Sequence, residues 1–258
     1  MRCYKVFIFV SFSLRIRYHT AMSFKRVFIK MNDVKKKQTL DPVKNKFNRR
    51  VLFPTFLYDI KVAEAAELNT RLLQDIYKER ELDEKGLQRS NLKGLGGWHS
   101  KNSLHQKDEF RPLANKIVRA GDRISSNLGY NPEFRLAIGQ MWTIVNPPGS
   151  ANRAHIHPNC LWSGVYYVQT PEKSGDIEFI DPRTQNLAHQ PAFHSGQKRL
   201  PATVPVAQIT PSAGQMLIFP NWLYHSVAPN LSTDTEEKAD RIVIAFNLIQ
   251  VRKQRQTK

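Results

Sequence analysis

The chain has 258 residues and a formal net charge of +17, from 39 Lys+Arg against 22 Asp+Glu. Its length suffices for one large domain, and 41% hydrophobic and 10% aromatic residues exclude a wholly disordered chain. The excess charge lies at the ends, since residues 1–50 hold 14 basic and 2 acidic residues and residues 252–258 hold 4 basic residues and no acidic one. Residues 51–251 keep 21 basic and 20 acidic residues, so we expect no specific nucleic-acid binding by this core.

These charges predict a basic extension, a single domain over residues 51–251 and a basic tail. The extension has a short apolar run, residues 6–10, that indicates either a targeting segment or a start site placed too far upstream. Cys3 and Cys160 suggest neither a disulfide framework nor a zinc site, which fits a reducing compartment. We expect a cytoplasmic protein, with organelle targeting through the basic N-terminus as the alternative.

The first half of the domain, about residues 51–130, is predicted to be mainly helical. It opens with an apolar, strand-like run over residues 51–58. Helical spacing predicts a helix over residues 60–82, with a stripe of Ile60, Ala63, Ala66, Leu73 and Ile76. After a glycine-rich loop, Gly94–Ser100, a second helix is predicted over residues 109–128, with a stripe of Phe110, Leu113, Ile117, Ile124 and Leu128.

The second half, about residues 131–251, has the composition of short strands separated by Pro, Gly and Asn turns. The predicted strands are Phe134–Val145, His155–His157, Gly164–Thr170, Asp176–Ile180, Gln215–Phe219 and Arg241–Gln250. Residues 183–213 are long, polar and contain prolines, which predicts a loop. Helices followed by many strands indicate the α+β class, with a jelly-roll sandwich or barrel packed against N-terminal helices.

Three of the eight histidines have a spacing that suits a metal site. His155 and His157 form an H-x-H pair, and on a strand residues i and i+2 face the same side, with Cβ atoms about 6–7 Å apart. His225 follows a strand and a proline turn, and can join them from a distant part of the sheet. Such a set with open coordination positions is typical of non-haem iron oxygenases. The alternative is that these histidines only form hydrogen bonds in the core or at the surface.

Arg241 opens a strand with two different faces. Arg241, Val243, Ala245 and Asn247 share one face, which suits a cavity wall, whereas the opposite face carries large apolar side chains. An arginine in such a place can bind a carboxylate through two hydrogen bonds. The alternative is a strand-end arginine that pairs with Asp240 or with solvent.

Other residues near these motifs have simpler interpretations. We expect structural or surface roles for His99, His105, His189 and His194. Trp142, Trp162 and Tyr167 are near the site in the sequence and are expected in the core, with the wall of the site as the alternative.

The ordered set of motifs resembles the 2-oxoglutarate- and Fe(II)-dependent oxygenases. It is similar in particular to a narrower group, mostly bacterial and phage-borne, whose substrates are generally unassigned. The motifs are Leu52–Thr55, Gly96–Ser100, His155–Asn159, Ser163–Val168, Asp181–Arg183, Phe219–His225 and Arg241–Asn247. Each is weak alone, but together they are collinear over about residues 51–250 and imply a double-stranded β-helix, the cupin-like jelly roll.

The resemblance also implies roles for the site residues. His155 and His225 correspond to the two metal-binding histidines of the superfamily, and Arg241 to the residue that binds the distal carboxylate of 2-oxoglutarate. His157 stands where the superfamily usually has Asp or Glu, so three neutral imidazoles would leave more positive charge at the metal. The carboxylates that follow on the chain lack the spacing of this ligand and rank below His157; they are Asp176, Glu178 and Asp181.

These roles imply a dioxygenase that uses Fe(II), 2-oxoglutarate and O2 and hydroxylates a substrate that the motifs do not name. Two alternatives stay open. One is a cupin-like metalloenzyme without 2-oxoglutarate, and the other is a non-catalytic binding module with basic ends. The sequence gives no sign of the oligomeric state.

Overall fold

The computed structural model describes residues 48–89, 97–183 and 188–253. All the elements below lie in the compact unit Leu52–Lys258. The predictions for the basic extension, for Gly94–Gly96 and for most of the tail lie outside the described residues. No helix in the described part is both long and apolar enough to cross a membrane.

The chain forms three α-helices in its described part, α1 (Ala65–Leu82), α2 (Gly86–Arg89) and α3 (Arg111–Asn127). Short 3₁₀ helices are η1 (Leu104–Gln106), η2 (Asp108–Phe110), η3 (Pro201–Thr203) and η4 (Glu236–Ala239). The first strands are β1 (Tyr58–Lys61), β2 (Trp98–His99), β3 (Phe134–Asn146), β4 (Asn152–His155) and β5 (Trp162–Gln169). The others are β6 (Ile177–Ile180), β7 (Val206–Ile209), β8 (Gln215–Pro220), β9 (His225–Val227) and β10 (Arg241–Arg252).

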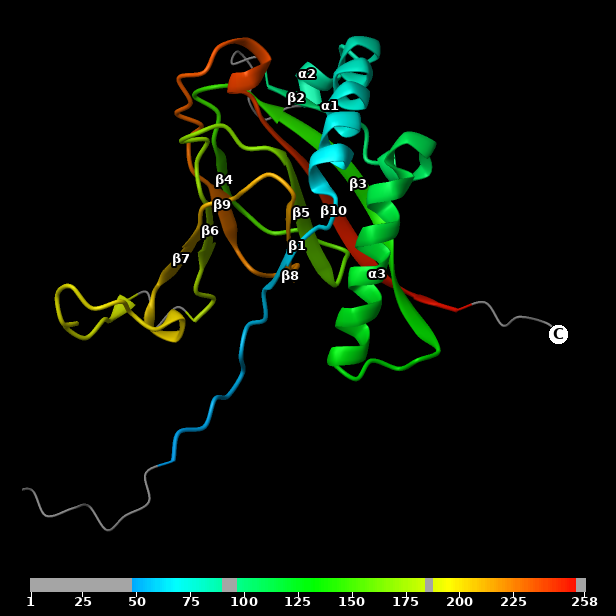
Figure 1. Cartoon of the computed structure of the whole chain (residues 1–258). Coiled ribbons are helices and arrows are strands. Elements are labelled where there is room, and N and C mark those ends of the chain that lie inside the picture. Colours follow the sequence, from blue (N-terminus) through cyan, green and yellow to red (C-terminus); the bar gives the residue numbers. More distant parts are fainter. Residues whose placement is uncertain (1–47, 90–96, 184–187, 254–258) are drawn as a thin grey trace, which may run out of the picture. The chain divides into compact units, whose positions relative to one another are not determined.

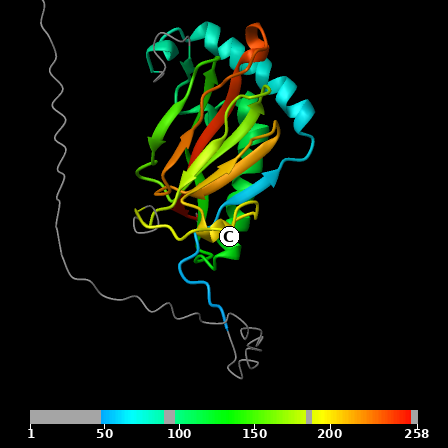
Figure 2. The same cartoon turned by 90° about the vertical axis from the view of Figure 1, so that its left-hand side faces the viewer.

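The strands form two antiparallel sheets, of order β1-β8-β5-β10-β3-β2 and β4-β9-β6-β7. Helices α1 and α3 cover the face of the larger sheet that points away from the smaller one (Figure 1). Between the sheets lies a second apolar cluster that joins β5, β6 and β8 (Figure 2 shows the two sheets from the side of the smaller one). The predicted α+β class and jelly roll with N-terminal helices are confirmed.

The predicted start of the first helix is wrong. Ile60 lies in β1 opposite Met216, and the helix begins after Glu64, whose φ of 58° is left-handed. The buried stripe is Leu68, Leu72 and Ile76, four residues apart, rather than the alanine-containing stripe.

The strand predicted over residues 51–58 is also wrong, except at its last residue. Val51 is 72% exposed and Phe53 is 96% exposed, and β1 begins only at Tyr58. On this side β8 pairs only with residues 58–61, so the preceding apolar residues have no strand beside them in the described structure.

The second helix and most strands agree with the predictions. In and beside α3, Phe110, Leu113, Ile117 and Ile124 are each at most 2% exposed. Gly129 follows the helix with a φ of +67°, as a helix-ending glycine does. The predicted loop 183–213 is wrong at one point, because Val206–Ile209 forms β7 beside β6.

Candidate metal centre

The three predicted histidines come together at one end of the smaller sheet. His155 ends β4 and His225 begins β9, and the two residues pair directly across the strands. Their ring centroids lie 4.3 Å apart. The site therefore begins as a cross-strand pair, whose side chains share one face of the sheet.

His157 reaches the same place by a different route from the one predicted. It lies beyond the end of β4, so the strand geometry predicted for the H-x-H pair is wrong. Instead its backbone N–H donates to the carbonyl oxygen of Asn221 at 3.1 Å. Its ring centroid lies 5.2 Å from that of His155 and 5.2 Å from that of His225.

One ligand atom from each histidine lies within 4.8 Å of the others, and no other described His, Cys, Asp or Glu joins this group. The nearby carboxylates have other partners. Glu178 accepts hydrogen bonds from Gln208 and Ser226, and Asp181 pairs with Arg183. The ranking of His157 above the carboxylates as a ligand stays a prediction.

Each of the three rings has its Nδ1 turned toward an oxygen acceptor. The acceptors are the carbonyl oxygens of Arg153 at 2.8 Å for His155 and of Leu223 at 3.0 Å for His225. For His157 the acceptor is Oδ1 of Asn247, at 2.8 Å. An Nδ1 that faces an acceptor carries the proton, so each Nε2 keeps a lone pair for a metal ion.

The surroundings favour the neutral form of two of these rings, those of His157 and His225. Burial lowers the pKa of His225 to about 3, against the hydrogen bond to Leu223, and the two other histidines lower it further. Burial also lowers the pKa of His157, against its hydrogen bond to Asn247. Neutral imidazole is the form that binds metal ions, so at neutral pH the rings of His157 and His225 need not lose a proton first.

Arg241 is buried at the start of β10, with 1% of its surface exposed. Its Nη1 donates to the carbonyl oxygens of Ser174 and Ala228, while Nη2 is buried with no hydrogen-bond partner. Asp240 lies against Arg80 instead, so the alternative of an Asp240–Arg241 pair is wrong. Burial lowers the pKa of Arg241 to about 10, which still leaves the guanidinium charged at neutral pH.

The histidines and Arg241 line one cavity of about 1240 Å³. The two predicted faces of β10 are confirmed. Arg241, Val243, Ala245 and Asn247 line the cavity, whereas the alternate residues pack in the core against the helices; these are Ile242, Ile244, Phe246 and Leu248.

Three residues expected to be structural also line this cavity. Trp142 was expected in the core, yet its half-buried ring lies in the cavity wall, 5.6 Å from His157 and 5.9 Å from His99 between ring centroids. The His99 and Trp142 rings are stacked, with 13° between their planes. Tyr167 is buried and also lines the cavity, whereas Trp162 is in the core, as predicted.

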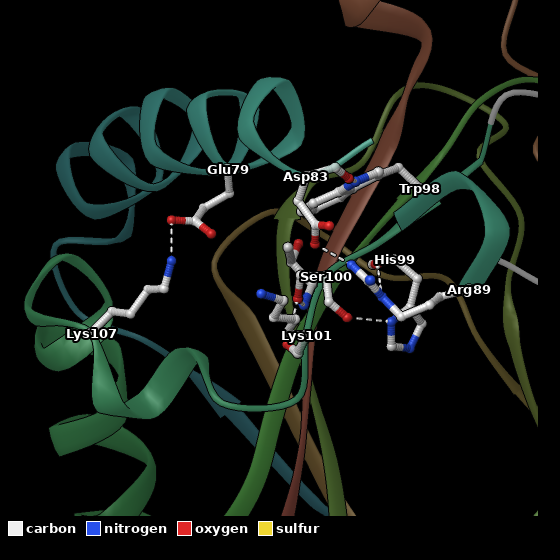
Figure 3. Close-up of polar contacts among 9 residues, drawn as sticks. Glu79, Asp83, Arg89, Trp98, His99, Ser100, Lys101 and Lys107 are labelled. Carbon is white, nitrogen blue, oxygen red and sulfur yellow. Dashed lines mark hydrogen bonds and ion pairs between the residues drawn. The ribbon is translucent and has the colours of Figure 1, made fainter. Parts of the chain in front are cut away.

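His99 is held rigidly by its neighbours (Figure 3). It pairs with Ile144 across β2 and β3, and its carbonyl oxygen accepts a hydrogen bond of 3.2 Å from Nε of Arg89. The indole of Trp98 beside it is fully buried and donates to the carbonyl oxygen of Asp83 at 2.9 Å. The Gly-Gly-Trp-His-Ser motif was the signal in the sequence that could have assigned His99 to the site.

Residues 140–247 match a family model described as "Putative 2OG-Fe(II) oxygenase". Over these residues the chain is similar to the 2OG-Fe(II) oxygenases. The matched residues include all three histidines and Arg241. Its enzyme class is thus an oxidoreductase that uses Fe(II) and 2-oxoglutarate.

Solved structures of this fold are similar over most of the chain. The alpha-ketoglutarate-dependent carbocyclase SnoK of nogalamycin biosynthesis has 14% identity and a TM-score of 0.52, over 74% of this chain and 78% of that one. The epimerase SnoN of the same pathway has 14% identity and a TM-score of 0.51, over 77% and 79%. A Pseudomonas putida prolyl-4-hydroxylase has 15% identity and a TM-score of 0.49, over 77% and 92%. No curated protein matches the sequence.

Proposed function

We propose that the chain is a 2-oxoglutarate-dependent dioxygenase that hydroxylates a substrate with release of succinate and CO2. In this proposal His155, His157 and His225 hold Fe(II), and Arg241 holds the far carboxylate of 2-oxoglutarate. The iron, 2-oxoglutarate and O2 supply the oxidising power when bound, and the chain supplies the binding, the orientation and the dry surroundings.

The histidine set supports the metal part of this proposal. One ligand atom of each histidine lies within 4.8 Å of the others. Each Nδ1 faces an oxygen acceptor on Arg153, Leu223 or Asn247, which leaves Nε2 as the atom available for a metal ion. Such outer contacts fix the tautomer and the orientation of a metal-binding imidazole. Imidazole nitrogens suit iron, and a set of three leaves positions open for other ligands.

Nη2 of Arg241 is the observation on which the proposal mainly rests. It is a buried donor of a charged group, has no partner among the described residues, and belongs to a residue that lines the cavity of the three histidines. A buried guanidinium without a carboxylate is costly, so a bound anion is the natural partner. A dicarboxylate that binds the metal ion through one end is able to give Nη2 of Arg241 a hydrogen-bond partner through the other.

Tyr167 is a second hydrogen-bond donor for a carboxylate bound by Arg241. It lines the cavity, and burial raises its pKa, so its hydroxyl keeps the proton and is able to donate it to a carboxylate. Around it the walls are mainly apolar, through Val165, Phe219 and Val243. Apolar walls exclude water and strengthen the ionic contact of Arg241.

Binding of 2-oxoglutarate to the zinc-loaded full-length chain tests the proposal, because zinc forms the site without turnover. Calorimetry is expected to give one site for 2-oxoglutarate in the wild type and affinity weaker by about a hundredfold in Arg241→Met, since a charged contact is lost. Zinc affinity is expected to stay unchanged in this variant, which shows that the site is still folded. Arg135→Met, outside the cavity, is the matched control.

The opposite result distinguishes the main alternative. If 2-oxoglutarate does not bind the zinc-loaded wild type, or binds Arg241→Met equally well, the result favours a cupin-like metalloenzyme that does not use 2-oxoglutarate. Formation of succinate from 2-oxoglutarate by the Fe(II)-loaded wild type then tests the reaction itself. The cytoplasmic location expected from the two cysteines stays a prediction.

A further inference from the structure

The cavity has a one-sided set of charges. Four histidines and two arginines, Arg153 and Arg241, line it, and no Asp or Glu is present among the described lining residues. The described lining residues therefore give the cavity positive charge and imidazoles, but no negative charge.

Loading with the cofactors of the proposed function does not remove this imbalance. The two charges of Fe(II) and the two of 2-oxoglutarate cancel, and the two arginines then remain as an excess of positive charge. The charge of buried Arg241 acts through a lower dielectric than that of water, whereas the charge of exposed Arg153 is partly screened by solvent. A cationic substrate is disfavoured in such a cavity, and an anionic one is favoured.

The cavity also has room for a second molecule. At about 1240 Å³ it exceeds the range of about 300–1,000 Å³ that is usual for a pocket with a single ligand. Arg241 is buried and is assigned to 2-oxoglutarate in the proposed function, so the positive charge left for a second molecule is that of Arg153.

Arg153 lies close to the metal centre and at the surface. It stands two residues before His155 in β4, and its carbonyl oxygen accepts the hydrogen bond from His155 Nδ1. Its side chain is exposed and forms no ion pair with a described carboxylate. A guanidinium in this position is able to bind a carboxylate or a phosphate through two hydrogen bonds.

Another part of the cavity wall is flat and aromatic. Trp142 and His99 form a stacked pair that lines the cavity. The ring of Trp142 also lies beside that of His157, with 5.6 Å between the centroids. A planar group is able to pack on such a surface in an offset stack. The wall therefore suits the body of a substrate whose charge is held elsewhere.

We propose that the substrate hydroxylated by this chain is a small anion, whose carboxylate or phosphate binds Arg153 and whose planar body packs against Trp142 and His99. This inference rests on the proposed function, because it concerns the space beside 2-oxoglutarate. It predicts a charge selectivity that is measurable before the natural substrate is known.

Three isosteric probes test the charge selectivity, namely benzoate, benzamide and benzamidine, which are an anion, a neutral molecule and a cation. Each is titrated into the full-length protein loaded with zinc and saturated with 2-oxoglutarate, and binding is followed by ligand-observed NMR. Benzoate is expected to bind at least about tenfold more tightly than benzamide, and benzamidine more weakly than either. Arg153→Gln is expected to remove the advantage of benzoate, and Arg153→Lys to keep most of it.

Arg135→Gln is the matched control, because it removes the same charge from an exposed position outside the cavity. The inference is overturned if benzamide binds as tightly as benzoate, if benzamidine binds best, or if no probe binds. It is also overturned if benzoate binds only by displacing 2-oxoglutarate. A failure of the proposed function gives a different result, since 2-oxoglutarate itself then does not bind the zinc-loaded protein.

Discussion

Asn247→Ala is expected to weaken metal binding without touching a metal ligand. Asn247 is 6% exposed on the cavity face of β10. Its Oδ1 accepts from Nδ1 of His157 at 2.8 Å, and its Nδ2 donates to Oε1 of Gln140 at 3.1 Å. The second bond orients the amide so that its oxygen faces the histidine. Without the amide, the ring of His157 is free to turn. The tautomer that carries its proton on Nδ1 and leaves Nε2 available for a metal ion also loses its support.

The magnitude follows from what such contacts contribute elsewhere. Loss of an outer partner of a metal-binding histidine weakens metal affinity by about 10–100-fold, or about 1.4–2.8 kcal/mol. The two lost hydrogen bonds are expected to lower the free energy of unfolding of the metal-free protein by about 1–3 kcal/mol. Asn247→Asp keeps an acceptor for the histidine and is expected to keep most of the metal affinity.

The assay is competition for Co(II) or Zn(II) against a chelator of known affinity, with urea unfolding of the metal-free proteins as the stability measurement. Gln140→Ala is the matched control, because it removes only the hydrogen bond from Asn247 to Gln140. It is expected to weaken metal binding less than Asn247→Ala. An Asn247→Ala protein that is folded and binds metal within twofold of the wild type would refute the reasoning. In that case the orientation of His157 does not depend on Asn247.

Two further predictions concern the packing and the pH dependence of the same region. Gly164→Ala is expected to destabilise the protein by at least about 1–3 kcal/mol in urea unfolding, because a Cβ there would lie 2.2 Å from the ring of Phe246 in the core; unchanged stability would contradict this packing. The metal-free protein is expected to lose stability as the pH falls from 6.5 toward 3, by up to about 1.4 kcal/mol per pH unit, because unfolded His225 binds a proton that the folded residue, with its pKa lowered to about 3, does not. Urea unfolding from pH 7 to pH 4 measures this slope, and an equal slope in His225→Asn would show that another group causes it.

The local patterns of the sequence predicted much of the fold. The alternation along β10 assigned Arg241 and Asn247 to one face and Ile242 to the other, and the structure confirms both faces. Helix α3 was equally clear, because an apolar stripe such as Phe110 and Leu113 is visible in the sequence without knowing which residues it packs against. Both patterns depend only on the period of the backbone, which a sequence displays directly.

Boundaries and partners followed from contacts that no local pattern contains. Ile60 looked like the first residue of a helical stripe, but β8, more than a hundred residues away in the chain, makes it a strand residue. His157 reaches the candidate site through the carbonyl oxygen of Asn221 rather than through a regular strand. Likewise the cavity position of Trp142 depends on His99 and His157, which lie on other elements.

By itself the sequence determined the residue types of the site, the α+β class and the location of the excess charge in the terminal segments. The tertiary structure decided how these residues are used. It buries Arg241 and engages its Nη1 with Ser174 and Ala228, while Nη2 stays without a partner among the described residues. It also gathers the three histidines in a cavity without a described carboxylate. Burial and unpaired donors are properties of several elements packed together, and for that reason they are not readable from one segment of chain.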